Sequence, residues 1–77
     1  MDFVIRYRVD DGGEEVALAF ARRLFARFDT AIESLALIPV VDEDLDVYLN
    51  GQLVHSQGQS GRPPRLADVY AALERVG

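Results

Sequence analysis

Apolar and polar residues alternate at the start of the chain and then change to a helical spacing. From Phe3 to Val9 every second residue is apolar or aromatic, which is the period of a strand with one buried face. From Val16 to Phe28 the apolar residues recur every three or four positions, which predicts an amphipathic helix. The intervening Asp10–Gly13 has the composition of a turn, in which either aspartate would cap the helix.

A second strand and a hairpin are predicted next. Ile32–Ile38 is almost continuously apolar, and Pro39 is expected to end it. A strand, a helix and a strand in this order most simply form a right-handed parallel crossover. The apolar segments Leu45–Leu49 and Gln52–Ser56 flank an Asn-Gly pair, which predicts a β-hairpin with a two-residue type I′ turn.

The turn fixes the expected pairing of the hairpin, with Leu49 opposite Gln52 and Asp46 opposite His55. The side chains then expected on the core face are Leu45, Val47, Leu49 and Val54. Those expected on the opposite face are Asp46, Tyr48, Leu53 and His55. His55, the one histidine of the chain, is therefore interpreted as a solvated ion pair contributing no more than about 1 kcal/mol, and not as a catalytic or metal-binding group.

The last third of the chain predicts a loop and a closing helix. Gln57–Pro64 is rich in glycine, serine and proline, as loops are. Pro64 suits an early helical position, and Leu66–Val76 has an apolar stripe at helical spacing. The order β-α-β-β-β-α predicts one α/β domain over residues 1–77, with a sheet and helices in two layers.

Composition narrows the function classes. The net charge is −5 and all eight basic residues are arginine, so the chain lacks the basic surface that nucleic acids require. No apolar run approaches the roughly 20 residues that span a bilayer, and no secretory leader is visible, so a cytoplasmic protein is expected. The acidic connector at residues 42–44 lacks the spacing of a calcium loop. The absence of cysteine excludes thiolate chemistry and a cysteine-based zinc site, and neither a metal nor another cofactor is expected.

Several short motifs together resemble one known family. The motifs are a first strand ending at Tyr7, the helix end Leu24–Phe28, the segment Leu35–Pro39, the hairpin Asp46–Ser56 and the segment Ser60–Pro64. In this order they resemble the SelW/SelT/SelH (Rdx) selenoprotein-like family of thioredoxin-fold proteins. The resemblance implies a four-stranded mixed sheet with strands one and two parallel, strands three and four antiparallel, and both helices on one face.

The chain departs from that family at the family's functional centre. Arg8 and Asp11 stand where the family has the two cysteines of its Cys-x-x-Cys motif. Gly12 and Gly13 replace the basic-aromatic pair that commonly follows. The redox role that the resemblance implies is therefore carried over to no residue, and no catalytic residue is assigned.

The remaining expectation is a non-catalytic protein that binds another protein or forms a homodimer. The candidate interface on the open face of the sheet comprises Arg6, Arg8, Tyr48, Leu53 and His55. A second candidate surface is the helix flank formed by Leu18 and Phe25, which lie seven residues apart beside the buried stripe. The alternative is an enzyme or a small-molecule-binding protein that uses the acidic corner Asp10–Gly13 in place of thiols.

Overall fold

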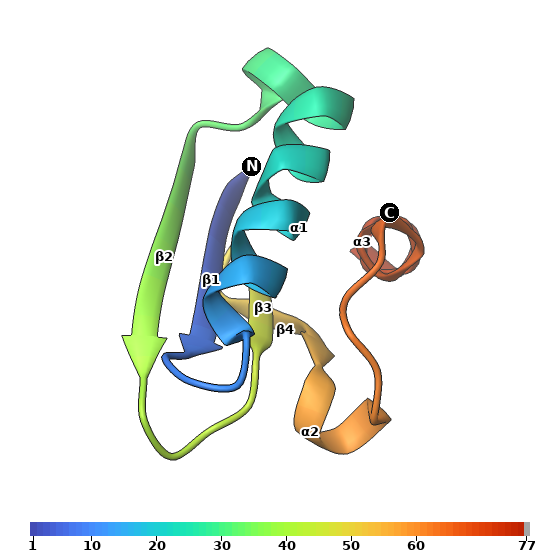
Figure 1. Ribbon diagram of the computed structural model, residues 1–77. Helices are drawn as coiled ribbons and strands as arrows, with labels where there is room; N and C mark the ends of the chain where they lie inside the picture. Colours follow the sequence, from blue (N-terminus) through green and yellow to red (C-terminus); the bar gives the residue numbers. More distant parts are fainter. Residues whose placement is uncertain (77) are drawn as a thin grey trace.

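Alternating and helical segments of the chain form a sheet and two long helices in the computed structural model, which describes residues 1–76. The strands are β1 (Asp2–Arg8), β2 (Ser34–Val40), β3 (Asp46–Leu49) and β4 (Gln52–Ser56). The helices are α1 (Gly13–Phe28), a short 3-10 helix η1 (Asp29–Ala31), a short α2 (Gln57–Ser60) and α3 (Leu66–Val76). Figure 1 shows α1 in front of the sheet and α3 beside the β4 end.

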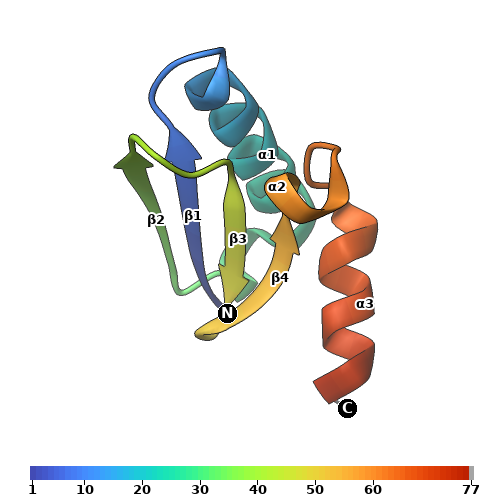
Figure 2. The same ribbon diagram turned by 90° about the horizontal axis from the view of Figure 1, so that it is seen from below.

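The sheet has the strand order β2-β1-β3-β4, with β1 and β2 parallel and β3 antiparallel to both β1 and β4. The view in Figure 2 shows the four strands side by side, with α1 and α3 on the same side of them. The predicted fold class is confirmed: a four-stranded mixed sheet in an α/β arrangement with both long helices on one face.

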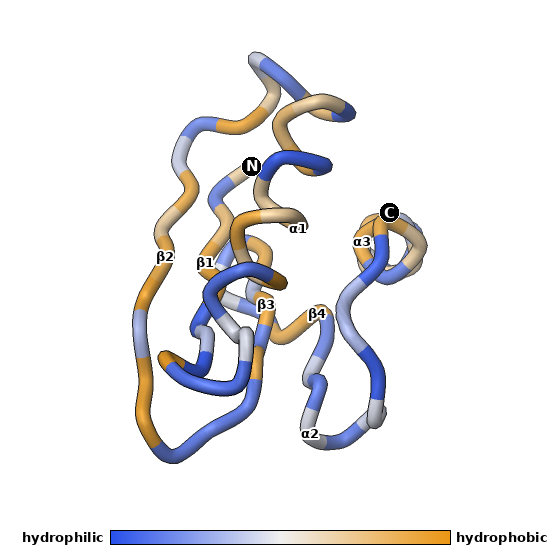
Figure 3. Tube along the Cα trace, viewed as in Figure 1, coloured by the Kyte–Doolittle hydropathy of each residue, from blue (hydrophilic) through white to orange (hydrophobic). Residues whose placement is uncertain are grey.

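The core lies between this face of the sheet and the two helices. Its fully buried large side chains come from both layers and are Phe3, Ile5, Phe20, Leu24, Val47 and Val69. The ring of Phe28 lies 6.3 Å from that of Phe3 and 5.9 Å from that of Tyr70, so it joins β1, α1 and α3. Figure 3 shows apolar residues along the central strands and polar residues in the turns that connect them. None of the helices within residues 1–76 is long and apolar enough to cross a membrane.

The prediction that Pro39 ends the second strand is wrong, because β2 continues to Val40. Val9 donates its N–H to the carbonyl of Val40, and Ser34 directs its own N–H to Met1. Backbone groups alternate in direction along a strand, so residues at even positions of β2 face β1 and Pro39 faces away. Since β2 is an edge strand, the missing N–H of Pro39 removes no hydrogen bond from the sheet.

The predicted hairpin pairing holds only next to the turn. Leu49 pairs with Gln52 and Tyr48 with Leu53, but a β-bulge then brings Val47 opposite His55. The bulge inserts Val54 as an extra residue, so His55 turns toward the core. The predicted Asp46–His55 pair and the placement of His55 on the open face are therefore both wrong.

Three helix boundaries also differ from expectation. The N-cap of α1 is Gly12, in a left-handed conformation with φ 77°, so the predicted aspartate cap is wrong. The segment predicted as a loop begins with α2, because the Ser56 side chain accepts a hydrogen bond from the N–H of Gln59. The closing helix starts at Leu66, two residues after the expected Pro64.

Candidate functional site

The turn between β1 and α1 holds an exposed ion cluster around Arg8. The Arg8 Nε donates to Asp10 Oδ1 at 2.6 Å, and the guanidinium lies 3.7 Å from Asp11 and 3.7 Å from Asp44. The hydrogen bond to Asp10, followed by the charges of Asp10 and Asp11, raises the pKa of Arg8 further above its ordinary value. Arg8 and Asp11, the two residues that the sequence resemblance matched to the family's cysteines, are thus brought together as an ion pair.

The backbone of this corner is tightly built. Asp11 has φ 56° and Gly12 φ 77°, so the chain turns through two left-handed residues before α1 begins. A Cβ at Gly13 would overlap the carbonyl oxygen of Arg8, because the start of the helix lies against the end of the strand. The close approach explains why glycine occupies that position.

A polar cavity of about 120 Å³ opens beside Arg8 and is bordered also by Gln57. The side-chain oxygen of Gln57 is buried there without a hydrogen-bond partner among residues 1–76. The carboxylates around the cavity already surround one guanidinium, and among the described residues no group of histidine and acidic side chains is arranged to hold a metal ion. The corner therefore offers charge and water-sized space, but no thiol and no metal-binding set.

A second, shielded cluster gathers around Asp68 at the start of α3. Arg62 donates two hydrogen bonds to its carboxylate, at 2.9 and 2.7 Å, and the N–H of Arg65 donates a third at 2.8 Å. His55 Nδ1 lies 3.3 Å from the same carboxylate. The hydrogen bond from Arg62 is the main reason that the pKa of Asp68 falls to about 2.

The His55 ring lies between the Ser60 hydroxyl and the Asp68 carboxylate, as the histidine of a hydrolase triad does. The hydrogen bonds of His55 oppose that role. His55 Nε2 lies 3.2 Å from the Ser60 hydroxyl and 2.9 Å from the carbonyl oxygen of Arg62. A carbonyl oxygen only accepts, so Nε2 carries the hydrogen and cannot take a proton from Ser60. The Ser60 hydroxyl itself donates to the same carbonyl. The cluster joins β4, α2 and α3 and has a structural role.

Sequence reasoning missed this cluster, although one signal was present. An acidic residue at the third position of a helix often accepts from the N–H that precedes the helix, as Asp68 does from Arg65. The approach of Arg62 and His55 had no local signal, because it depends on the bulge in β4 and on the path of the loop before α3.

The open face of the sheet carries an apolar row that crosses all four strands. Ala36 lies beside Val4, Val4 beside Tyr48, and Tyr48 beside Leu53. On the adjacent row, Arg6 lies between Ile38 and Asp46 and forms an ion pair with Glu43 at 3.3 Å. Ile38 and Leu53 are 42% and 44% exposed. Of the residues predicted for this face, Arg6, Arg8, Tyr48 and Leu53 lie there and His55 does not.

The predicted flank of α1 is also exposed, with Leu18 at 39% and Phe25 at 50%. On the other flank of α1, Arg27 lies over the ring of Tyr70 in α3. Leu18 and Phe25 are about 160–180° from Arg27 at 100° per residue, so they face away from α3. Figure 1 shows β2 on that side of α1. This surface is therefore separate from the open face of the sheet.

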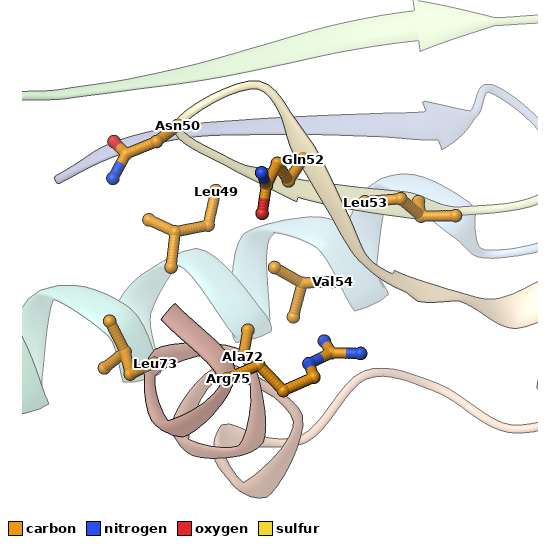
Figure 4. A pocket seen from close by; sticks show the side chains of 8 residues that line it. All are labelled: Leu49, Asn50, Gln52, Leu53, Val54, Ala72, Leu73 and Arg75. Atoms are coloured by element: carbon orange, nitrogen blue, oxygen red, sulfur yellow. The ribbon is translucent and has the colours of Figure 1, made fainter. Parts of the chain in front are cut away.

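An apolar cavity of about 160 Å³ lies between the hairpin and α3. Figure 4 shows Leu49 and Val54 pointing from the strands toward Ala72 of the helix, with Leu73 and Arg75 at the margin. The space is comparable to cavities that hold one benzene ring. Leu73 is partly exposed at its mouth.

Comparison with solved structures identifies the fold. The crystal structure of a selenoprotein W-related protein from Vibrio cholerae superposes with a TM-score of 0.82 over 97% of this chain and 94% of that chain, at 19% sequence identity. No family model matches this chain, and no curated protein matches it. The resemblance derived from the motifs is confirmed in its fold, and the chain has the thioredoxin-like architecture of a selenoprotein W-related protein.

Proposed function

We propose that this chain is a protein-binding module with a thioredoxin-like fold and no thiol redox activity. The observation that carries the proposal is the apolar row Ala36–Val4–Tyr48–Leu53, which crosses a sheet face that neither long helix covers. A tyrosine and aliphatic side chains beside an arginine are the composition of protein interfaces. The row provides a continuous surface for another protein.

The β1–α1 corner supports the second half of the proposal. A thiol-disulfide exchange needs a thiolate, and the 77 residues contain no cysteine. Arg8, which the sequence resemblance matches to one of the family's cysteines, forms an ion cluster with three carboxylates. An assay for disulfide reduction should therefore give no rate above buffer, and activity that follows the protein through purification would contradict this part.

The binding surface is tested by capture of partners from native cells with a tagged protein. The Tyr48→Asp variant places a charge in the middle of the row and should lose the captured proteins. The matched control is Leu73→Asp, because Leu73 is also a partly exposed apolar side chain but lies on α3, away from both the open face and β2. Equal capture by wild type and Tyr48→Asp would show that the open face is not the interface.

A further inference from the structure

We infer that the free edge of β2 binds an extended, basic-ended segment of a partner protein as a fifth strand of the sheet. This inference deepens the proposed function and rests on it, because it names a second contact through which the module holds a protein. The β2 edge and the open face of the sheet are different surfaces. Binding at the edge and binding at the open face can therefore be disproved by different experiments.

The first argument is the direction of backbone groups in β2. The hydrogen bonds of Ser34 and Val40 to Met1 and Val9 place the even-numbered residues of β2 against β1. Leu35 and Leu37 therefore direct their N–H and C=O groups away from the sheet. No strand lies on that side of β2 in residues 1–76. These groups match the ladder that an added strand requires.

The second argument is that Pro39 alone protects this edge strand. Residues 34–41 contain no charged side chain, and β2 has the same length as β1. Pro39 removes one outward N–H near the end of the strand and leaves those of Leu35 and Leu37. An uncharged edge of this length is a site at which another strand adds.

The third argument is the apolar surface next to the edge. Leu35 and Leu37 pair with Phe3 and Ile5, so their side chains lie on the helix side of the sheet and are partly buried against the core. Leu18 and Phe25 are exposed on the flank of α1 opposite α3, and Figure 1 shows β2 on that side of α1. Alternate side chains of an added strand would lie on the helix side of the sheet, beside Leu35 and Leu37, which selects apolar residues at every second position.

Charge decides between a partner protein and a second copy. Glu33 precedes β2 and Asp42 follows it, and both are exposed. Two copies of this chain would each bring a net charge of −5 to the pair, and this long-range repulsion opposes self-association. The protein carries a net charge of −5, so the complementary strand is an apolar segment with arginine or lysine at its ends.

The test uses an acetylated nonapeptide, Arg-Thr-Val-Thr-Val-Thr-Val-Thr-Arg, and amide exchange measured by NMR on the intact chain. At a peptide concentration of about ten times Kd, exchange at Leu35 and Leu37 should slow by about tenfold, because only the free protein exposes these amides. The amides of Ala36 and Ile38 are internal controls, since they already face β1 and should change little. A peptide with glutamate at both ends should bind more weakly, and Phe25→Asp should weaken binding of the arginine-ended peptide.

Each outcome supports or overturns the inference that the β2 edge binds a strand of a partner protein. Slowed exchange at Leu35 and Leu37 that persists in Tyr48→Asp supports the edge and separates it from the open face. No slowing at peptide concentrations up to the solubility limit overturns the inference, as does equal binding of the glutamate-ended peptide. Slowing that depends on protein concentration without peptide would assign the edge to a second copy and overturn the partner assignment.

Discussion

Arg8 with Asp10 and Arg62 with Asp68 form the same chemical pair at nearly the same distance, 2.6 and 2.7 Å, but water reaches them differently. The Asp10 side chain is 62% exposed, whereas that of Asp68 is 13% exposed. A solvated pair gains little, because water screens the attraction and the side chains lose freedom. The two pairs differ in the carboxylate, and a shielded carboxylate is costlier to remove because water replaces it less readily as a hydrogen-bond acceptor.

The comparison separates two uses of acidic residues in one small domain. The carboxylates at the β1–α1 corner surround Arg8 on the surface and hold no second element against the core. Asp68 is bonded to Arg62 and Arg65 and lies next to His55, so it holds the start of α3 against β4. The contribution of α3 to the core, through Val69, depends on this attachment.

The largest expected effect is therefore loss of the shielded carboxylate. Asp68→Ala should lower the free energy of unfolding by about 2–3 kcal/mol, because it removes the charged acceptor of the hydrogen bonds from the Arg62 guanidinium and the Arg65 N–H. Urea unfolding followed by circular dichroism measures the change. The matched control Asp10→Ala removes the exposed carboxylate of the Arg8 pair and should stay within about 0.5 kcal/mol of wild type. Equal losses in the two variants would refute the distinction by burial.

We expect the β1–α1 corner to tolerate the loss of a charged side chain better than the addition of a side-chain atom at Gly13. Gly13→Ala should lower the free energy of unfolding by about 2 kcal/mol, since the new Cβ overlaps the Arg8 carbonyl and the strand end must move. Gly12→Ala meets no neighbouring atom and should cost about 1 kcal/mol for its left-handed conformation alone. Thermal unfolding of both variants gives the comparison. A Gly13→Ala protein as stable as wild type would contradict the close approach.

Local patterns predicted the elements, and the exceptions have a common physical cause. The Asn50-Gly51 turn specified the first two pairs of the hairpin because that interaction is local. The side of the sheet that His55 faces depends on a bulge and on a carboxylate thirteen positions later, so alternation alone assigned it to the wrong face.

Pro39 shows the same dependence on long-range context. A proline ends a strand only where its nitrogen would have had to donate a hydrogen bond, and that depends on which side of β2 is occupied. The sequence around Pro39 does not contain this information. The pairing of Arg8 with Asp10 and Asp11 could have been predicted from the sequence, since the three residues lie within four positions. The approach of Asp44 depends on the fold and could not.

The acid dependence of stability sharpens the comparison further. The pKa of Asp68 is about 2 in the folded protein and near 3.8 without its partners, so the unfolded chain binds more protons between these values. Asp68 therefore contributes about 2 kcal/mol that is fully present above pH 3.8 and is lost as the pH falls through 2. Urea midpoints measured down this range should fall in wild type and fall less in Asp68→Asn. Parallel curves for the two proteins would assign the acid sensitivity to other groups.

The smallest expected effect is removal of the exposed arginine. Arg8→Gln leaves Asp10, Asp11 and Asp44 close together without their cation, so their mutual repulsion should destabilise the corner. Because the cluster is exposed, the melting temperature should fall by less than about 4 °C at low salt, and the difference should vanish as added salt screens the carboxylates. Arg22→Gln, on the exposed side of α1, is the control for loss of one positive charge alone. A salt-independent decrease in Arg8→Gln would mean that Arg8 stabilises the corner by packing. The Arg8 cluster would then have a structural role like that of the Arg62–Asp68 cluster, although its carboxylates are exposed.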